Sequence, residues 1–379
     1  MAQNLPKLPD WEQISTNIVR ILGGNPSKFT LQGTNTYLLG TGPRRILIDT
    51  GAGEKKWIDT LRTVLTSQSR PITVSTCLLT HWHHDHLGGV RDLEKLCREL
   101  NSPEEGGGAV KVYKNQPTWN PDGLIDPSRV HDILDGQIFS VPPSEDSASG
   151  RTTTEEAPFE IQAIHTPGHA KDHMVFQITS SPDPTEVGAL FTADNVLGHG
   201  TAVFEDLHLY LQSLDVMKRR VADAVVTQQA QKGGTITSKR AFPGHGAVID
   251  DAVAKIDEYI AHRRMREEEA LNVLKHGTTT PPGGSEPLVH DSITRVGDDG
   301  DDEAAGASPA NVAVGGGEIA LGKEWESIEM VKVIYRHYPE NLWQPAENGL
   351  LMVLEKLRRD GKVVRSKEGR WRVSEKATL

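Results

Sequence analysis

The sequence contains few cysteines, few aromatic residues and no long hydrophobic run. Cys77 and Cys97 are too few for a disulfide framework, and Cys77 lies in an apolar run where a buried, inert thiol is common. Every apolar stretch is far shorter than the roughly 20 residues that span a bilayer, so we expect no membrane segment. The first residues resemble neither a secretory signal nor a mitochondrial presequence, which predicts a cytoplasmic protein.

An excess of positive charge is also missing. The chain has 41 Lys and Arg residues against 52 Asp and Glu residues, a formal net charge of −11. This balance argues against a broad nucleic-acid surface, because phosphate binding needs clustered Lys and Arg. Between Gly277 and Gly322, eight acidic residues stand against one arginine, so −7 of the −11 lies there. Because this stretch is rich in Gly, Pro, Ser and Asp, we predict a disordered acidic linker over 277–322.

The predicted linker divides the chain into a large domain, 1–276, and a small module, 323–379. In the large domain, short β-like runs alternate with helical segments, a pattern that predicts the α/β class. Helices are expected over 55–67, 86–100, 207–220 and 250–275. A polar stretch near 140–158 predicts an extended surface loop.

After the predicted linker, apolar residues recur at helical spacing over 327–338 and 345–360. The segment GKVVRSKEGRWRV follows with a strand, turn and strand pattern, and Gly369 lies near the turn. Two helices and a β-ribbon predict a small winged-helix-like module.

The segment from Leu79 to Gly89, LTHWHHDHLGG, carries the strongest chemical signal. At the end of an apolar run, four of six positions can bind a metal ion: His81, His83, Asp85 and His86. Side-chain alternation puts His81 and His83 on one side, and a turn into a helix after Asp85 aims the other two toward a neighbouring point. One motif can therefore serve two metal ions. Three further candidates each end an apolar run: His169, Asp194 and His245.

Together these residues resemble the motifs of the metallo-β-lactamase superfamily, which begin with an Asp, here Asp49 in LIDTG. The resemblance implies a metallo-β-lactamase αββα sandwich. It further implies a first metal ion held by His81, His83 and His169, a second held by Asp85, His86 and His245, and Asp194 as the bridge between them. Asp49 is expected to support this cluster without binding metal, or else to serve only as a turn residue at a strand end.

Four residues in or beside these motifs are not among the seven candidate ligands. Ala193 stands where the superfamily commonly has glycine, a change that should be tolerated if its φ is negative. His84 occupies the variable position of the cluster and is expected to point away from the metal ions. His173 and His199 lie in matching segments, where each either contacts substrate, supports a ligand through a hydrogen bond or faces solvent.

The flanking segments TLQGTNTYLLGTG, TPGHAKDHM and GHGTAVFEDL resemble lactamase-like proteins that carry a C-terminal winged-helix-like region. This resemblance covers about 16–275 and 323–373, and it implies two competing activities. One is that of fungal polyketide-pathway thioesterases, which release a polyketide acid from an acyl carrier protein. The other is single-strand-specific endoribonuclease activity. A glyoxalase-like thioester hydrolase shares the metal motif but matches the flanking segments less well.

The ligand types indicate the chemistry. Imidazole and carboxylate groups suit zinc, although manganese and iron accept the same donors. We expect two zinc ions and attack by a shared hydroxide, because coordination lowers the pKa of water from 15.7 to about 7. Asp85, or else the bridging position, handles the proton of the incoming water, and Asp85 is the candidate catalytic residue.

These considerations favour a thioesterase that acts on an acyl carrier protein, with the endoribonuclease as the alternative. The predicted wing contains a set of basic residues: Lys362, Arg365, Lys367, Arg370 and Arg372. They either contact RNA or an acidic carrier protein, or form an ordinary solvated surface. A third interpretation is a binding protein with a structural metal site. Seven candidate ligands for two ions leave room for water, which favours catalysis over this interpretation.

Overall fold

The structure is a computed structural model that describes residues 5–67, 72–100, 109–141, 157–231, 238–280 and 323–375. It divides into two compact units: unit 1 is Met1–Glu205 with Leu209–Asp257, and unit 2 is Asp206–His208 with Glu258–Leu379. The predicted linker from residue 281 onward and residues 142–156 of the predicted surface loop lie outside the described residues. The predicted domain boundaries at 276/277 and 322/323 stay predictions.

Unit 1 contains a seven-stranded sheet within its described residues. In spatial order its strands are β1 (Trp11–Ser15), β2 (Ile18–Leu22), β3 (Asn35–Leu39), β4 (Arg44–Ile48), β5 (Thr73–Leu79), β6 (Lys111–Lys114) and β7 (Val130–Asp132). The first four strands pair antiparallel, whereas β4 to β7 run parallel. Parallel strands end at one edge of a sheet, so the residues that follow β4, β5 and β6 gather there.

A second sheet has five strands in the order β12 (Ala241–Pro243), β11 (Leu190–Ala193), β10 (Met174–Ser180), β9 (Phe159–His165) and β8 (Ile138–Val141). Because β11 and β12 are parallel, Asp194 and His245 leave the sheet at the same end. The antiparallel pair of β9 and β10 places His165 opposite Met174, and the loop between them carries His169. Short 3-10 helices cover Pro127–Arg129 and Pro184–Glu186.

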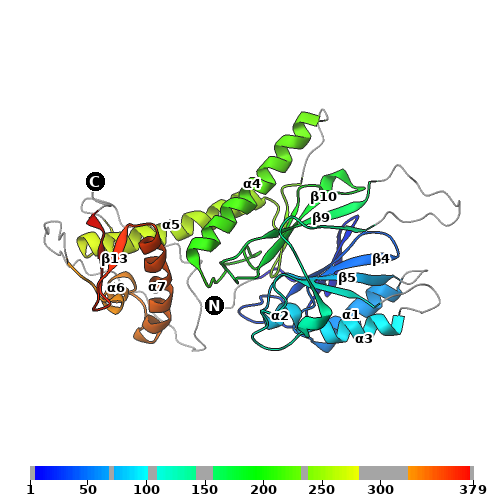
Figure 1. Cartoon of the computed structure of the whole chain (residues 1–379), viewed down its shortest axis with the longest axis horizontal. Helices are drawn as coiled ribbons and strands as arrows, with labels where there is room; N and C mark the ends of the chain where they lie inside the picture. The colour runs from blue at the N-terminus through cyan, green and yellow to red at the C-terminus, as the bar shows by residue number, and fades with distance from the viewer. Residues whose placement is uncertain are drawn as a thin grey trace. The chain divides into compact units, whose positions relative to one another are not determined.

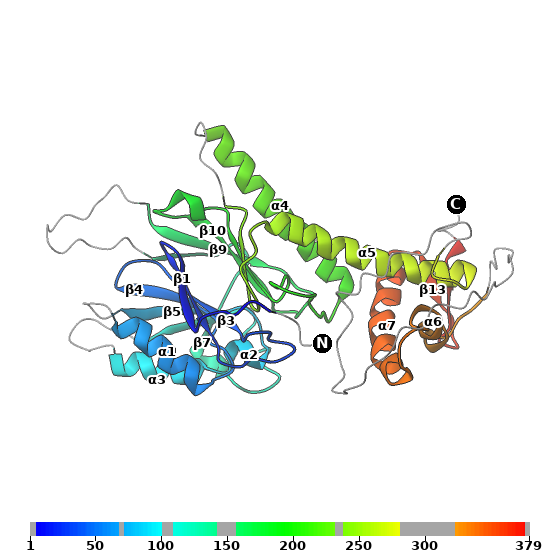
Figure 2. The same ribbon diagram turned by 180° about the vertical axis from the view of Figure 1, so that it is seen from behind.

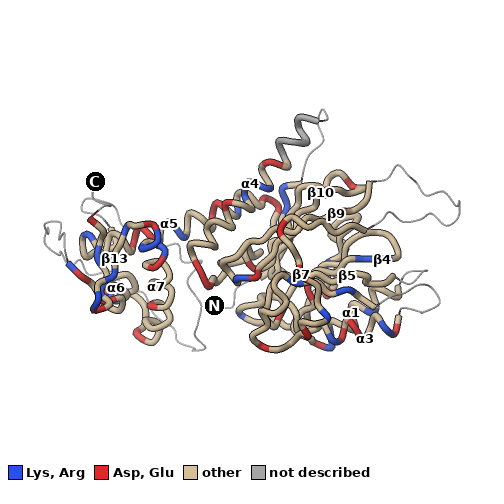
Figure 3. The backbone as a smooth tube through the Cα atoms, in the orientation of Figure 1, with Lys and Arg blue, Asp and Glu red and all other residues tan. Residues whose placement is uncertain are grey.

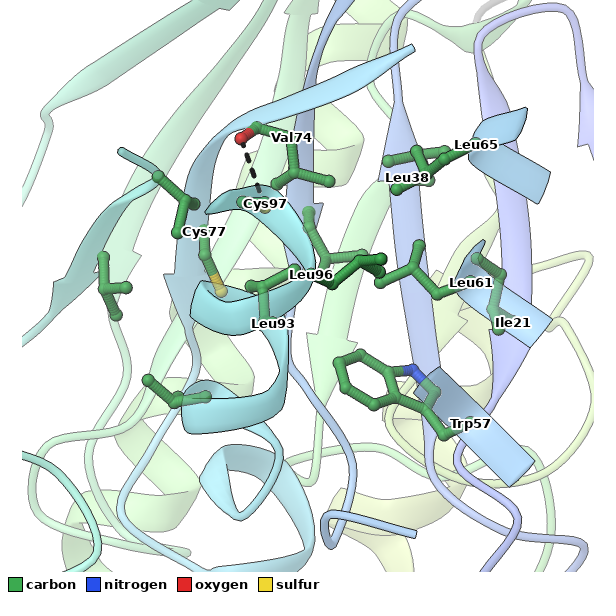
Figure 4. Close-up of a cluster of buried hydrophobic side chains, with 14 of the residues drawn as sticks. Ile21, Leu38, Trp57, Leu61, Leu65, Val74, Cys77, Leu93, Leu96 and Cys97 are labelled. Atoms are coloured by element: carbon green, nitrogen blue, oxygen red, sulfur yellow. Dashed lines mark hydrogen bonds between the residues drawn. The ribbon is translucent and has the colours of Figure 1, made fainter. Parts of the chain in front are cut away.

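Strands β2 and β3 of the first sheet are buried along their whole length, because both faces of the sheet are covered there. Ile46 and Ile48 pack into a core between the two sheets, while Leu47, between them in sequence, packs into a second core beneath α1 (Lys55–Thr66) and α3 (Val90–Leu100). Figure 4 shows this second core, where Leu93 of α3 lies beside Cys77 of β5 and Trp57 of α1 belongs to the same cluster.

The outer face of the second sheet is covered by α4 (Leu207–Gln231). Gln177 of β10 donates from its side-chain amide to the Arg220 carbonyl of α4 at 2.9 Å. The four layers are therefore helices, sheet, sheet and helix, visible from opposite sides in Figure 1 and Figure 2. This arrangement confirms the predicted αββα sandwich. Burial of each large core side chain contributes about 1.5–3 kcal/mol to its stability.

Two helical predictions for unit 1 need correction. The helix expected over 86–100 is two helices, α2 (His84–Leu87) and α3, and α2 begins before Asp85 instead of after it. The break lies at Gly88 and Gly89, where the chain passes close to another backbone: a Cβ at Gly89 would lie 2.2 Å from the Thr50 carbonyl oxygen. The helix expected to end at residue 220 continues as α4 to Gln231.

Unit 2 contains most of α5 (Ala252–His276), followed by the small module. Its elements are α6 (Ser327–Ile334), a 3-10 helix η4 (Glu340–Leu342), α7 (Trp343–Arg359), β13 (Val363–Arg365) and β14 (Trp371–Val373). Glu326 and Glu329 form a capping box at the start of α6, and Gly369 adopts φ +85° in the ribbon turn. Two helices and a β-ribbon confirm the winged-helix-like module, although α6 ends before residue 338. Among the described helices, none is long and apolar enough to cross a membrane.

Candidate metal centre

The seven predicted ligands converge where the ends of strands from the two sheets meet. Three groups of side chains place their potential ligand atoms within 4.8 Å of one another. The groups are His81, His83 and His169; Asp85, His86 and His245; and His81, His86 and Asp194. The first two groups have the same membership as the two ligand sets implied by the resemblance.

The first group consists of three imidazole rings that face one another. His81 Nε2 lies 2.9 Å from His83 Nδ1, and His169 Nε2 lies 3.2 Å and 3.0 Å from these two atoms. Tetrahedral zinc with Zn–N distances of about 2.0–2.1 Å separates nitrogen ligands by roughly 3.3 Å, close to these values. His169 Nδ1 lies 2.8 Å from the Val203 carbonyl oxygen, so it carries the proton and Nε2 presents a lone pair. The residues present therefore fit a metal ion.

Burial sets the protonation of this first group. Burial and the neighbouring rings lower the pKa of His81 well below its usual value, and burial with His169 lowers the pKa of His83 to about 4. Both rings are consequently neutral at pH 7. A neutral imidazole is the form that binds a metal ion, so this group needs no loss of a proton from either ring before binding.

The second group is an ionic cluster. His245 Nε2 lies 3.2 Å from Asp85 Oδ2, and His86 Nε2 lies 3.7 Å from the same oxygen. Burial would raise the pKa of Asp85, but His86 and His245 hold it at about 2. Burial would likewise lower the pKa of His245, but Asp194 and Asp85 raise it to about 9. A metal ion that binds here must therefore displace protons from imidazole.

Asp194 lies between the two groups. Its Oδ2 is 3.2 Å from His245 Nε2 and 3.7 Å from His169 Nε2, and its Oδ1 is 3.3 Å from His86 Nε2. His86 Nε2 and Asp194 Oδ1 are buried, and neither has a hydrogen-bond partner among the described residues. Buried polar atoms are nearly always satisfied, so these two atoms face the position that a metal ion would take.

Asp49 follows β4 and supports the cluster from behind. Its Oδ2 accepts from His86 Nδ1 at 2.8 Å and from the Thr80 hydroxyl at 2.9 Å, and its Oδ1 accepts from the Thr80 backbone N–H at 2.8 Å. The residue is buried and adopts φ +59°, a left-handed conformation that Asp tolerates better than most residues. These contacts agree with the expected supporting position.

The remaining histidines lie in different surroundings. His173 is fully buried, and its Nε2 accepts from the Asp194 backbone N–H at 3.2 Å while its Nδ1 lies 3.0 Å from Thr166 Oγ1. It therefore supports the residue between the two groups. His199 is exposed, and His84 is exposed as well, as expected for the variable position of the motif.

The condition stated for Ala193, a negative φ, is not met. Its φ is +43°, in the left-handed region that favours glycine. The pairing of β11 with β12 shifts register between Phe191 and Ala193, and such irregularities turn the strand so that the next side chain is re-aimed. Nearby, a Cβ at Gly244 would lie 2.3 Å from Asp194 Oδ1. Backbone geometry on both strands thus determines where the Asp194 carboxylate lies.

Sequence reasoning missed several polar residues beside the cluster. Lys114 and Asp172 form a buried ion pair, and Trp82 packs against His83 while its Nε1 lies 3.3 Å from Glu205 Oε1. The one available signal was the position of Lys114 at the end of an apolar strand. A single polar residue at such a place is too common to predict a partner.

Comparisons with known proteins identify both parts of the chain. Residues 29–229 match the metallo-beta-lactamase superfamily, and residues 327–371 match the beta-lactamase associated winged helix domain. Lactamase-like protein nscB of Aspergillus fumigatus is 43% identical over 270 residues, which are 71% of this chain but only 65% of that protein. An atrochrysone carboxyl ACP thioesterase of Claviceps purpurea is 38% identical over 295 residues, covering 78% of this chain and 76% of that protein.

Two solved structures share the fold. A beta-lactamase domain protein from Burkholderia ambifaria has a TM-score of 0.60 at 15% identity, covering 98% of this chain and 96% of that chain. A metallo-beta-lactamase family protein from Thermus thermophilus has a TM-score of 0.51 at 19% identity, covering 97% and 99%. The chain belongs to the metallo-β-lactamase superfamily and carries a β-lactamase-associated winged helix domain.

Proposed function

We propose that the protein is a zinc-dependent thioesterase that hydrolyses an acyl thioester on an acyl carrier protein and releases a polyketide acid. The observation that carries this proposal is the similarity to two relatives named atrochrysone carboxyl ACP thioesterase, at 38% and 39% identity over 295 residues. The neutral, convergent imidazoles of the first group and the carboxylates of the second supply the donor set that zinc prefers.

Each group would hold one metal ion. His81, His83 and His169 form the first site, and a second site is formed by Asp85, His86 and His245. Asp194 would bridge them from its position between His169, His86 and His245. When bound, two such ions would polarise the thioester carbonyl and lower the pKa of nearby water.

Asp85 is our candidate for the residue that accepts the proton of the attacking water. Its side chain is 26% exposed, whereas those of Asp194 and His245 are 11% and 2% exposed. Water therefore reaches the Asp85 side chain more easily than the other two. The leaving thiol has a pKa near 8.5, so its departure needs little help from an acid. The chain therefore needs to supply a proton acceptor more than a proton donor.

The basic residues of the wing support the solvated interpretation over RNA binding. Arg370 lies 3.0 Å from Glu326, and Arg372 lies 3.7 Å from Glu324, all within unit 2. Figure 3 shows Lys and Arg interspersed with Asp and Glu along this unit. Paired charges neutralise fewer phosphates than free ones, so the wing would attract the RNA backbone only weakly.

The metal content tests the binuclear site. Purified wild-type protein is expected to hold two zinc or similar ions per chain after dialysis, because seven candidate ligands exceed what one tetrahedral ion can use. Asp194→Ala should lower this stoichiometry and abolish turnover. Asp122→Ala is the matched control, since Asp122 is an exposed residue of the same unit. One tightly held ion in an active wild-type enzyme would overturn the binuclear assignment.

The substrate is tested by giving one zinc-loaded preparation two substrates: a polyketidyl or aryl thioester on its carrier protein, and a single-stranded RNA oligonucleotide. We expect thioester cleavage that is lost in Asp194→Ala and kept in Asp122→Ala. Cleavage of RNA alone, with the same dependence on Asp194, would replace the thioesterase by the endoribonuclease. Two bound ions without cleavage of either substrate would favour a structural metal site.

A further inference from the structure

A fully buried ion pair lies beside the candidate metal centre. Lys114 Nζ is 2.5 Å from Asp172 Oδ2, and both side chains are 0% exposed. Nζ also donates to the carbonyl oxygens of Asn115 at 3.1 Å and Trp119 at 2.9 Å. Removing two charges from water is costly and rarely improves stability over apolar packing. A contribution to stability therefore does not explain this ion pair.

The acidic partner belongs to the loop that carries His169. This loop joins β9 to β10 and folds back on itself, because the Thr166 backbone N–H donates to the His173 carbonyl oxygen at 2.9 Å. Asp172 lies within the loop, three residues after His169. Its partner Lys114 stands opposite Leu79 of β5, and Leu79 lies two residues before His81.

The basic partner ends β6, the strand beside β5 in the first sheet. Its carbonyl contacts, which also include Gln116 at 3.4 Å, hold the chain just after β6 against the ammonium group. Because Lys114 also pairs with Leu79, the ion pair connects three separate segments: the end of β5, the end of β6 and the β9–β10 loop. The first two segments belong to one sheet and the third belongs to the other.

We propose that Lys114 and Asp172 are positioning residues that hold His169 of one sheet against His81 and His83 of the other. The inference rests on the proposed function, since it assumes that the first group binds a metal ion. The second group is held in other ways: His86 by Asp49, and His245 by its place just after β12. Loss of the pair should consequently weaken the first metal site and spare the second.

A control must separate this effect from a general loss of stability. Glu186 is suitable because it is a buried carboxylate of the same unit, and it accepts from Asn17 Nδ2 at 2.8 Å and from Ser181 Oγ at 2.6 Å. His173 precedes β10, and Glu186 lies beyond the other end of that strand. The strand has seven residues that rise about 3.3 Å each, so its two ends are roughly 20 Å apart. Glu186→Gln therefore perturbs a buried polar network without touching the candidate ligands.

The experiment measures Co²⁺ affinity by competition with a chelator, together with the visible spectrum of the bound Co²⁺. The full chain carries His245→Ala to isolate the first site, or His169→Ala to isolate the second. In each background, Asp172→Asn is compared with Glu186→Gln. We expect Asp172→Asn to weaken the first site by about 10–100-fold and to change its spectrum, because outer partners of ligands have effects of that size. The second site should stay unchanged, and Glu186→Gln should change neither site.

A double variant keeps the test decisive if Asp172→Asn fails to fold. Lys114→Met with Asp172→Leu leaves no unpaired buried charge, so its thermal midpoint should approach that of the wild type while the first site stays weak. Restored affinity in the double variant, or equal weakening of both sites by Asp172→Asn, would show that the pair only stabilises the fold. If the unmodified chain binds no metal ion, the proposed function itself fails; if both sites survive Asp172→Asn, only this inference fails.

Discussion

Asp49 Oδ2 lies 2.8 Å from His86 Nδ1, and this contact orients the His86 ring from behind. The same carboxylate accepts a hydrogen bond from the Thr80 hydroxyl, whose oxygen lies 2.9 Å from His81 Nδ1. An imidazole that donates through Nδ1 leaves Nε2 unprotonated and able to bind a metal ion. One carboxylate therefore sets the tautomer of a ring in each candidate site, directly for His86 and through Thr80 for His81.

Asp49→Asn should weaken metal binding while the fold is kept. Asn tolerates the left-handed φ of +59° at this position, so the substitution removes the charge and one acceptor with little backbone strain. We expect metal affinity to fall about 10–100-fold, measured by metal content after dialysis against a chelator. Asp126→Asn, at an exposed turn in the same unit, is the control and should lose no metal. Full metal retention by Asp49→Asn would contradict the supporting role.

Ala193→Gly should stabilise the protein. The left-handed φ of +43° costs an L residue roughly 1–2 kcal/mol, and glycine relieves that strain at a smaller entropic cost in the unfolded chain. We expect the free energy of unfolding, measured by denaturant titration, to rise by about 0.5–1 kcal/mol. Ala163→Gly in β9 should instead lower it by about that amount or more, because Ala163 is an ordinary buried strand residue. A loss of stability in Ala193→Gly would show that its conformation carries no strain.

Gly244→Ala should displace the Asp194 carboxylate. The added Cβ would lie 2.3 Å from Asp194 Oδ1 and 3.0 Å from His86 Cε1, so one of these groups must move. Metal content should fall below two ions per chain, and hydrolysis should be lost. Gly123→Ala is the matched control, because its Cβ would meet no atom within 4 Å and only its positive φ is strained. An active, fully loaded Gly244→Ala enzyme would mean that the carboxylate is free to rearrange.

The two cysteines should be inert in the folded protein. Burial raises the pKa of Cys97 to about 12 and raises that of Cys77 well above its usual range. The thiolate is the reactive form, so at pH 8 both groups stay protonated and shielded. A colorimetric disulfide reagent is expected to label neither thiol in the native protein and both in denaturant. Rapid labelling under native conditions would show that the core around α3 opens readily.

Several features were predictable because each depends on residues close together in the chain. The apolar runs that became β5 and β11 were recognisable from composition, and candidate ligands follow both strands closely. His81, His83, Asp85 and His86 occupy one short segment, so local geometry already brings them close to two neighbouring points. The two helices and ribbon of unit 2 were predictable for the same reason.

Other features depend on parts of the chain that meet only after folding. The break between α2 and α3 follows from the close pass of Gly89 to the Thr50 backbone, and the φ of Ala193 follows from the irregular pairing of β11 with β12.

The sequence by itself determined which residue types are available to bind metal, because ligand chemistry is a property of single side chains placed at strand ends. Only the tertiary structure decided how Lys114 and Asp172 pair, since one ends a strand of the first sheet, the other lies in a loop of the second sheet, and neither has a local signal that identifies its partner. It likewise decided the distances between His169 and the rings of His81 and His83, because these depend on how the two sheets pack.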